Sequence, residues 1–88
     1  MESNGLQRIT VKVAGNVFPL EVVPSEEEFY RIAAEILNRK LEYYEKAYPA
    51  LNRSKLLSMV AYDIAVGFLR YTNSNDLTDA ISELKGLV

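Results

Sequence analysis

The sequence predicts an α+β fold in which a two-stranded antiparallel hairpin is followed by two helices. Three observations lead to this prediction. Apolar residues alternate with polar ones over residues 9–13 and are in the majority over residues 17–23, recur at steps of one, three and four over residues 29–48, and fill almost every position over residues 56–71. The first pattern is typical of half-buried strands, the second of a helix with one apolar face, and the third of a helix buried on more than one side.

Two strands are predicted on either side of a turn of small residues at positions 14–16. In residues 9–13 the apolar side chains lie on one face of a strand and the polar ones on the other. Gly15 and Asn16 tolerate positive φ, which predicts a tight turn. Residues 17–23 form the second strand, and because Pro19 cannot donate to a ladder, this strand lies at an edge or turns that position towards water. An edge can pair with a second copy or with a partner peptide.

Residues 25–47 are predicted to form the first helix. Ser25 followed by Glu28 is the pattern of a capping box, in which each side chain satisfies a free backbone N–H of the first turn. Pro49 is expected to end the helix. Asn38 lies near the apolar stripe and is interpreted as a helix-packing or surface residue. The stripe itself consists of Phe29, Ile32, Ala33, Ile36, Leu37, Leu41, Tyr44 and Tyr48.

The second helix and the C-terminal tail are predicted to span about residues 54–87, with Asn52 or Ser54 as the helix cap. Because a chain of this size buries only roughly 60 to 65% of its surface, nothing is left to cover the second apolar side of this helix. We therefore expect a homodimer, the alternative being a monomer that consumes both faces internally. The expected contact residues are Leu57, Val60, Ile64, Phe68 and Tyr71.

Two polar features of this region leave alternatives open. Asp63 and Arg70 share one helix face, where both charges are expected to be solvated, although a two-fold interface could pair Asp63 of one copy with Arg70 of the other. Residues 72–76 are poor helix formers, and the apolar stripe resumes beyond them in a shifted phase. The tail is either a separate short helix or, as we favour, a continuation into a short coiled coil, because a second subunit can override weak local propensity.

Composition argues against most catalytic and nucleic-acid functions. The sequence has no His and no Cys, which removes the commonest metal ligands and the usual proton shuttle at neutral pH. Lys and Arg number 10 against 12 Asp and Glu, and no basic patch forms that would attract phosphates. We expect no enzyme activity, no cofactor and no metal. Without an apolar signal segment or membrane span, the protein is predicted to be cytoplasmic and not inserted in a membrane.

Three segments carry a resemblance to a known family. They read ITVKVAGNVFPLEV, FYRIAAEILNRKLEYY and RSKLLSMVAYDIAVGFL, and together they cover residues 9 to about 71. Their order and spacing resemble the bacterial cell-division protein ZapA family. The resemblance implies one ZapA-like domain over residues 1–88, with a hairpin head at about residues 7–23.

The resemblance further implies a non-enzymatic protein that binds the tubulin-like division GTPase FtsZ at midcell and cross-links or bundles its filaments to promote Z-ring assembly. It implies a homodimer through the second helix, and a tetramer where that helix extends into a coiled coil. Some members carry a basic residue just after the turn glycine, where this chain has Asn16. We expect the FtsZ contact on the hairpin head, with Lys12, Asn16 and Phe18 as its residues.

Two other functions compete with this one. The first is a generic dimeric adaptor that binds another protein through the hairpin edge or through exposed tyrosines. The second is a small ligand-binding or enzyme module with a pocket between hairpin and helices, which would need convergent polar groups that the sequence does not display.

Overall fold

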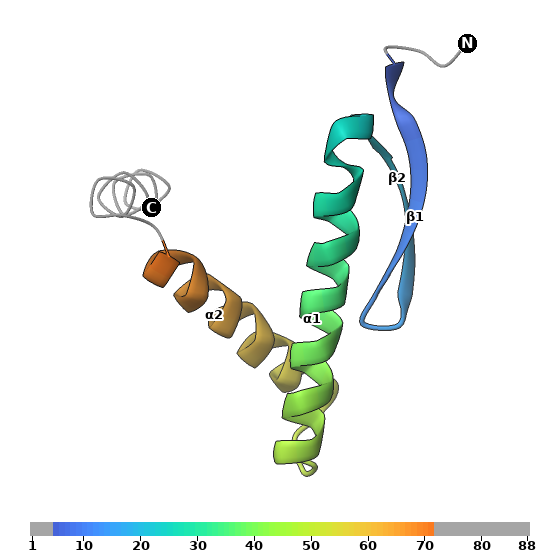
Figure 1. The fold of residues 1–88 in the computed structure, drawn as a ribbon. Coiled ribbons are helices and arrows are strands. Elements are labelled where there is room, and N and C mark those ends of the chain that lie inside the picture. The colour runs from blue at the N-terminus through green and yellow to red at the C-terminus, as the bar shows by residue number, and fades with distance from the viewer. Residues whose placement is uncertain (1–4, 72–88) are drawn as a thin grey trace, which may run out of the picture.

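The computed structural model describes residues 5–71 and confirms the α+β class (Figure 1). The hairpin lies along the first helix, and the second helix leaves the far end of the first at an angle, so the two helices form a V. The predicted coiled coil and the rest of the tail lie outside the described residues. In chain order the elements are β1 (Gln7–Val13), β2 (Asn16–Val22), a 3₁₀ turn η2 (Pro24–Glu26), α1 (Glu27–Ala47) and α2 (Arg53–Tyr71).

The hairpin turn is one residue shorter than the predicted range of residues 14–16. Its central residues are Ala14 and Gly15, with φ angles of 53° and 86°, whereas Asn16 already belongs to β2. Two successive positive φ angles are typical of a type I′ turn, whose twist matches that of the flanking strands. Such a two-residue turn makes Val13 and Asn16, which face each other across it, a hydrogen-bonded pair.

Pro19 fits this register without breaking the ladder. It lies opposite Thr10, and counting from the pair beside the turn, this is a pair whose backbone groups point away from the partner strand. The missing N–H of Pro19 is therefore one that β1 never needed. In the described residues the sheet has two strands, so β2 is an edge strand as predicted.

α1 begins two residues later than predicted, and the structure decides between the two predicted cap residues of α2. Pro24 opens the 3₁₀ turn η2, so Ser25 lies inside this turn, and α1 starts later with Glu26 as a cap that makes no side-chain hydrogen bond. The capping box therefore does not form. At α2, Oδ1 of Asn52 accepts a hydrogen bond from the Lys55 N–H at 2.8 Å, so Asn52 rather than Ser54 is the cap.

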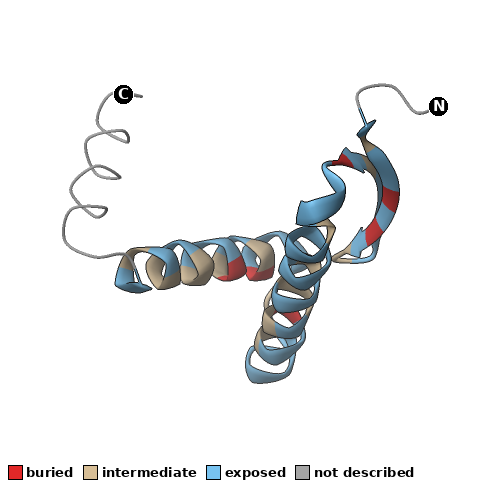
Figure 2. Cartoon of the chain, turned by 45° about the horizontal axis from the view of Figure 1, so that its top comes forward, coloured by how far each residue is buried: buried red, intermediate tan, exposed pale blue. Residues whose placement is uncertain are grey.

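Among the described residues the core consists of two small clusters that share α1 (Figure 2). Ile9, Val11 and Val22 of the hairpin form the first cluster, which packs against the N-terminal half of α1. Leu41 of α1 forms the second with two residues of α2, Leu56 and Val60. Since each cluster uses a different part of α1, this helix is the structural link between the hairpin and α2.

The apolar stripe predicted for α1 is only partly buried. Leu37, Leu41 and Tyr44 pack towards α2, because α2 contacts the C-terminal half of α1. Phe29 and Ile36, which have the same spacing, are exposed because neither the hairpin nor α2 reaches them. The described residues thus leave apolar surface uncovered on the inner side of the V, and large exposed apolar patches mark interaction sites.

Candidate functional site

The tip of the hairpin is fastened to both helices by two side chains. Asn38 of α1 donates a hydrogen bond from Nδ2 to the Lys12 carbonyl and accepts one at Oδ1 from the Ala14 N–H, both at 2.8 Å. Arg53 at the start of α2 donates from Nη2 to the Ala14 carbonyl at 3.2 Å and from Nη1 to the Glu45 carboxylate at 2.8 Å. We call Asn38 and Arg53 the tip clamp, because they fix the hairpin tip relative to the end of α1 and the beginning of α2.

Sequence reasoning missed the tip clamp. A signal for Asn38 does exist: Ala34 and Leu41, one turn away on either side, face the interior, and a polar side chain on such a helix face needs a partner. Arg53 offers no comparable signal, since the carbonyl that it binds lies 39 residues earlier in the chain.

The three residues predicted for FtsZ contact lie in one hairpin but on different faces. Lys12 lies on the outer face, which points away from α1. Phe18 lies opposite Val11, whose side chain is buried, so Phe18 belongs to the face nearer α1, yet it remains 46% exposed. Asn16 flanks the turn and is exposed. The structure therefore brings Asn16 and Phe18 to one face at the tip and places Lys12 on the other.

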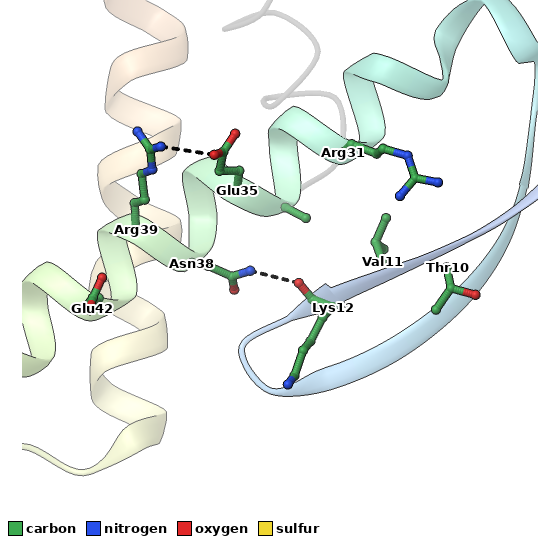
Figure 3. A pocket seen from close by; sticks show the side chains of 9 residues that line it. Thr10, Val11, Lys12, Arg31, Glu35, Asn38, Arg39 and Glu42 are labelled. Atoms are coloured by element: carbon green, nitrogen blue, oxygen red, sulfur yellow. Dashed lines mark hydrogen bonds and ion pairs between the residues drawn. The ribbon is translucent and has the colours of Figure 1, made fainter.

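A shallow groove of about 360 Å³ runs between β1 and α1. Figure 3 shows the Val11 side chain pointing towards α1, whereas the Thr10 and Lys12 side chains point away from it. On the α1 side the groove is lined by charged residues in helical pairs, such as Arg39 with Glu35 at 3.0 Å. The full lining is Thr10, Val11, Lys12, Arg31, Ala34, Glu35, Asn38, Arg39 and Glu42.

A second groove, of about 530 Å³, lies inside the V and is mostly apolar. We call it the V groove. Three of the residues predicted for the dimer contact line it, namely Ile64, Phe68 and Tyr71. Leu57 is half-buried against the second core cluster, and Val60 is only 1% exposed, so the core of the chain itself occupies the Val60 side chain.

Asp63 is less solvated than expected, because α1 supplies partners for its carboxylate, although its side chain remains 31% exposed. Its Oδ2 accepts a hydrogen bond from the Tyr44 hydroxyl at 2.7 Å, and its Oδ1 accepts one from Lys40 Nζ at 3.2 Å. The hydrogen bond from Tyr44, and then that from Lys40, lower the pKa of Asp63 below its ordinary value. The same bond raises the pKa of Tyr44. These contacts fasten α1 to α2 beside the V groove.

The described part of the chain holds no group of three or more His, Cys, Asp or Glu side chains that could bind a metal ion. None of its helices is long and apolar enough to span a membrane. What the geometry of residues 5–71 offers is open surface grooves, among them the two described above, together with a clamped hairpin tip and an exposed helix face. These features define a small α+β module that presents binding surfaces rather than an enclosed pocket.

Comparison with known proteins identifies the family. The family model described as cell division protein ZapA matches residues 9–87. The cell division protein ZapA of Shouchella clausii (strain KSM-K16) is 33% identical over 70 residues, which cover 78% of this chain and 87% of that protein. No solved structure gives a significant match. The chain belongs to the ZapA family of cell division proteins, as the three matching segments had indicated.

Proposed function

We propose that this protein binds FtsZ at midcell and cross-links or bundles its filaments, and so promotes Z-ring assembly without catalysing a reaction. Membership of the ZapA family supports a role in cell division. The observation that carries the mechanism is the uncovered apolar surface of α2 and the V groove. A cross-linker needs at least two binding heads on one body, and this surface can join two copies of the chain.

In the proposed homodimer, α2 of one copy covers the V groove of the other. Phe68 is 60% exposed and Tyr71 is 92% exposed, and burying one such aromatic side chain stabilises an association by about 1.5–3 kcal/mol. Ile64 and Leu57 are half-buried and contribute the surface that the core leaves free. We leave Val60 out of the contact set because its side chain has no free surface. A tetramer would require residues beyond 71.

The hairpin head is the proposed FtsZ-binding surface, with Lys12, Asn16 and Phe18 as contact residues. All three are exposed, and the tip clamp holds the tip in one position relative to both helices. A contact made by a pre-positioned tip loses less conformational entropy on binding than one made by a free loop. Because Lys12 lies on the opposite face from Phe18, a filament that contacts both must meet the hairpin end-on or edge-on.

Sedimentation of FtsZ assembled with GTP, with and without the protein, tests this function, together with light scattering on the protein alone. We expect co-sedimentation, increased bundling and the mass of a dimer or tetramer. A folded oligomer that leaves FtsZ unchanged would refute the proposed function.

Phe68→Glu separates oligomerisation from binding. The charge would be buried in the proposed interface, so we expect a folded monomer that still co-sediments with FtsZ but no longer bundles it. Tyr62→Glu is the matched control, because Tyr62 is 74% exposed on α2 but does not line the V groove. A Phe68→Glu dimer, or a monomer that still bundles filaments, would contradict the proposed interface.

Lys12→Glu tests the hairpin epitope. Because this side chain is exposed and has no carboxylate partner among residues 5–71, we expect an unchanged mass and weaker co-sedimentation. Lys46→Glu reverses the same charge at an exposed position of α1 and should leave co-sedimentation unchanged. Equal losses in both variants would show a general charge effect and remove Lys12 from the epitope.

A further inference from the structure

The register of the hairpin decides which backbone groups face outward. Bonded and non-bonded pairs alternate from Val13 and Asn16, so the N–H and C=O groups of Arg8, Thr10 and Lys12 point away from β2, along the edge beside α1. Within residues 5–71 the outward groups of Arg8 and Thr10 have no hydrogen-bond partner. Such a row of free groups is a template for another strand.

The two edges of the hairpin are not equivalent. By the same alternation, the outward positions of β2 are Val17, Pro19 and Glu21. Pro19 has no N–H, so the row of donors on that edge is interrupted at its centre, which is a common protection against strand addition. The edge of β1 has a donor at every outward position. Strand addition is therefore favoured at β1 and disfavoured at β2.

The side chain of Asn38 already makes hydrogen bonds to the outward backbone groups at one end of the β1 edge. Its carboxamide contacts the Lys12 carbonyl and the Ala14 N–H, both at 2.8 Å, and these are two groups that a neighbouring strand would use. The side chain thus occupies the place of one peptide unit of a third strand. It closes the edge towards the turn, and the edge stays open from Arg8 to the Lys12 N–H, beside the groove shown in Figure 3.

Charges along the open edge indicate the chemistry of the partner. The side chains of a third strand would lie beside Arg8, Thr10 and Lys12 at every second position on the outer face. Lys12 has no carboxylate partner in the described residues, and Arg8 has only a highly exposed one, Glu21 at 3.5 Å. We propose that the β1 edge binds an extended segment of a partner protein that carries acidic residues at alternate positions.

The open edge also sets the length of this segment. Four steps from Arg8 to Lys12 span about 14 Å at the strand rise of about 3.4 Å, which matches a segment of about five residues. Backbone hydrogen bonds supply the attraction, and the cationic outer face selects the sequence. The edge site shares Lys12 with the proposed FtsZ surface, but its argument rests on the free backbone groups of β1, so the Thr10→Pro comparison described below tests it separately from filament binding and bundling.

A peptide titration tests the site on the full-length protein in its natural oligomeric state. The probe is a capped heptapeptide of alternating glutamate and valine, and the comparison peptide replaces every glutamate with lysine. With ¹⁵N-labelled protein we expect the acidic probe to shift the amide resonances of Arg8, Thr10 and Lys12 and to slow hydrogen exchange at the Thr10 amide. Shifts confined to another surface, equal binding of both peptides, or no binding would overturn the proposal.

Two proline variants make the test specific for the edge. Thr10→Pro removes the central outward N–H of β1, and the matched control Val17→Pro removes an outward N–H of β2; neither N–H belongs to the ladder. We expect Thr10→Pro to weaken binding of the acidic probe by about tenfold and Val17→Pro to change it by less than about twofold. Equal losses in the two variants would refute edge binding.

If Thr10→Pro does not fold, Lys12→Glu provides a second test of the edge site, because it changes only an exposed side chain. We expect it to weaken the acidic probe by about tenfold and to strengthen the lysine peptide. Unchanged preference between the two peptides would exclude the charge selection that we propose.

Discussion

Replacing Asn38 with alanine tests whether its amide holds the hairpin on α1. The change removes two hydrogen bonds of 2.8 Å and leaves the Lys12 carbonyl and the Ala14 N–H without these partners. One intramolecular hydrogen bond contributes about 1 kcal/mol net, so the pair contributes about 2 kcal/mol. Because Asn38 is only half-buried, water replaces part of what is lost, and we expect the free energy of unfolding to fall by about 1–2 kcal/mol.

Urea unfolding followed by circular dichroism measures this loss, with all variants at one protein concentration because association would stabilise the folded state. Hydrogen exchange at the Ala14 amide gives a local reading, and we expect it to accelerate in Asn38→Ala. The matched control is Arg39→Ala at the next position. Its exposed ion pair with Glu35 contributes at most about 0.5 kcal/mol.

If Asn38→Ala costs no more than Arg39→Ala, the apolar contacts of the hairpin alone hold it in place, and the tip clamp would have to be abandoned. Asn38→Asp adds a second check. Its carboxylate can still accept from the Ala14 N–H, but it cannot donate to the Lys12 carbonyl. We therefore expect Asn38→Asp to be at least as unstable as Asn38→Ala at neutral pH.

Three further changes probe the hairpin turn, the α2 cap and the contact between the helices. Gly15→Ala should cost about 1 kcal/mol in unfolding free energy, because φ of 86° strains a residue with a Cβ. Asn52→Ala should cost about 1 kcal/mol by removing the α2 cap, whereas Asn52→Asp should cost much less. Tyr44 and Lys40 lower the pKa of Asp63, so its stabilisation is complete above the ordinary value of 3.8 and is lost as the pH falls through the folded-state value. Urea midpoints measured from pH 7 down to acid should thus fall less steeply in Asp63→Asn than in the unchanged protein.

The hairpin and both helices could be predicted because each has a hydrophobic period that local sequence displays. The exact turn could not, since Ala14, Gly15 and Asn16 are all small or tolerant of positive φ. Tertiary packing decides it: the observed register puts Ile9 and Val11 on the face that α1 covers, and a one-residue slip of pairing would disturb that face. The predicted capping box does not form because a 3₁₀ turn follows β2 and contains Ser25, so Ser25 does not occupy the cap position of α1.

For the candidate site, the sequence predicts which residues form an apolar helix face but not which part of that face the rest of the chain covers. Phe29, Ile36 and Leu41 belong to one helical stripe, yet only Leu41 is buried in the protomer, because burial depends on where α2 crosses α1. A stripe therefore predicts that a face will be covered, not whether the same chain covers it. The tip clamp could not be predicted from local sequence for the same reason, since Asn38 and Arg53 bind backbone groups that lie 24 to 39 residues earlier in the chain.

The placement of polar contacts along α1 bears on how a filament cross-linker could work. Asn38 joins α1 to the hairpin tip, and Tyr44, less than two turns later, joins it to Asp63 of α2. Since both joints lie on one short stretch of helix, the proposed binding tip and the proposed dimer surface move together. Avidity between two heads falls as the connection between them becomes more flexible, because a loose connection lowers their effective concentration on neighbouring filaments. Loosening either joint should therefore reduce bundling more than it reduces the binding of a single head.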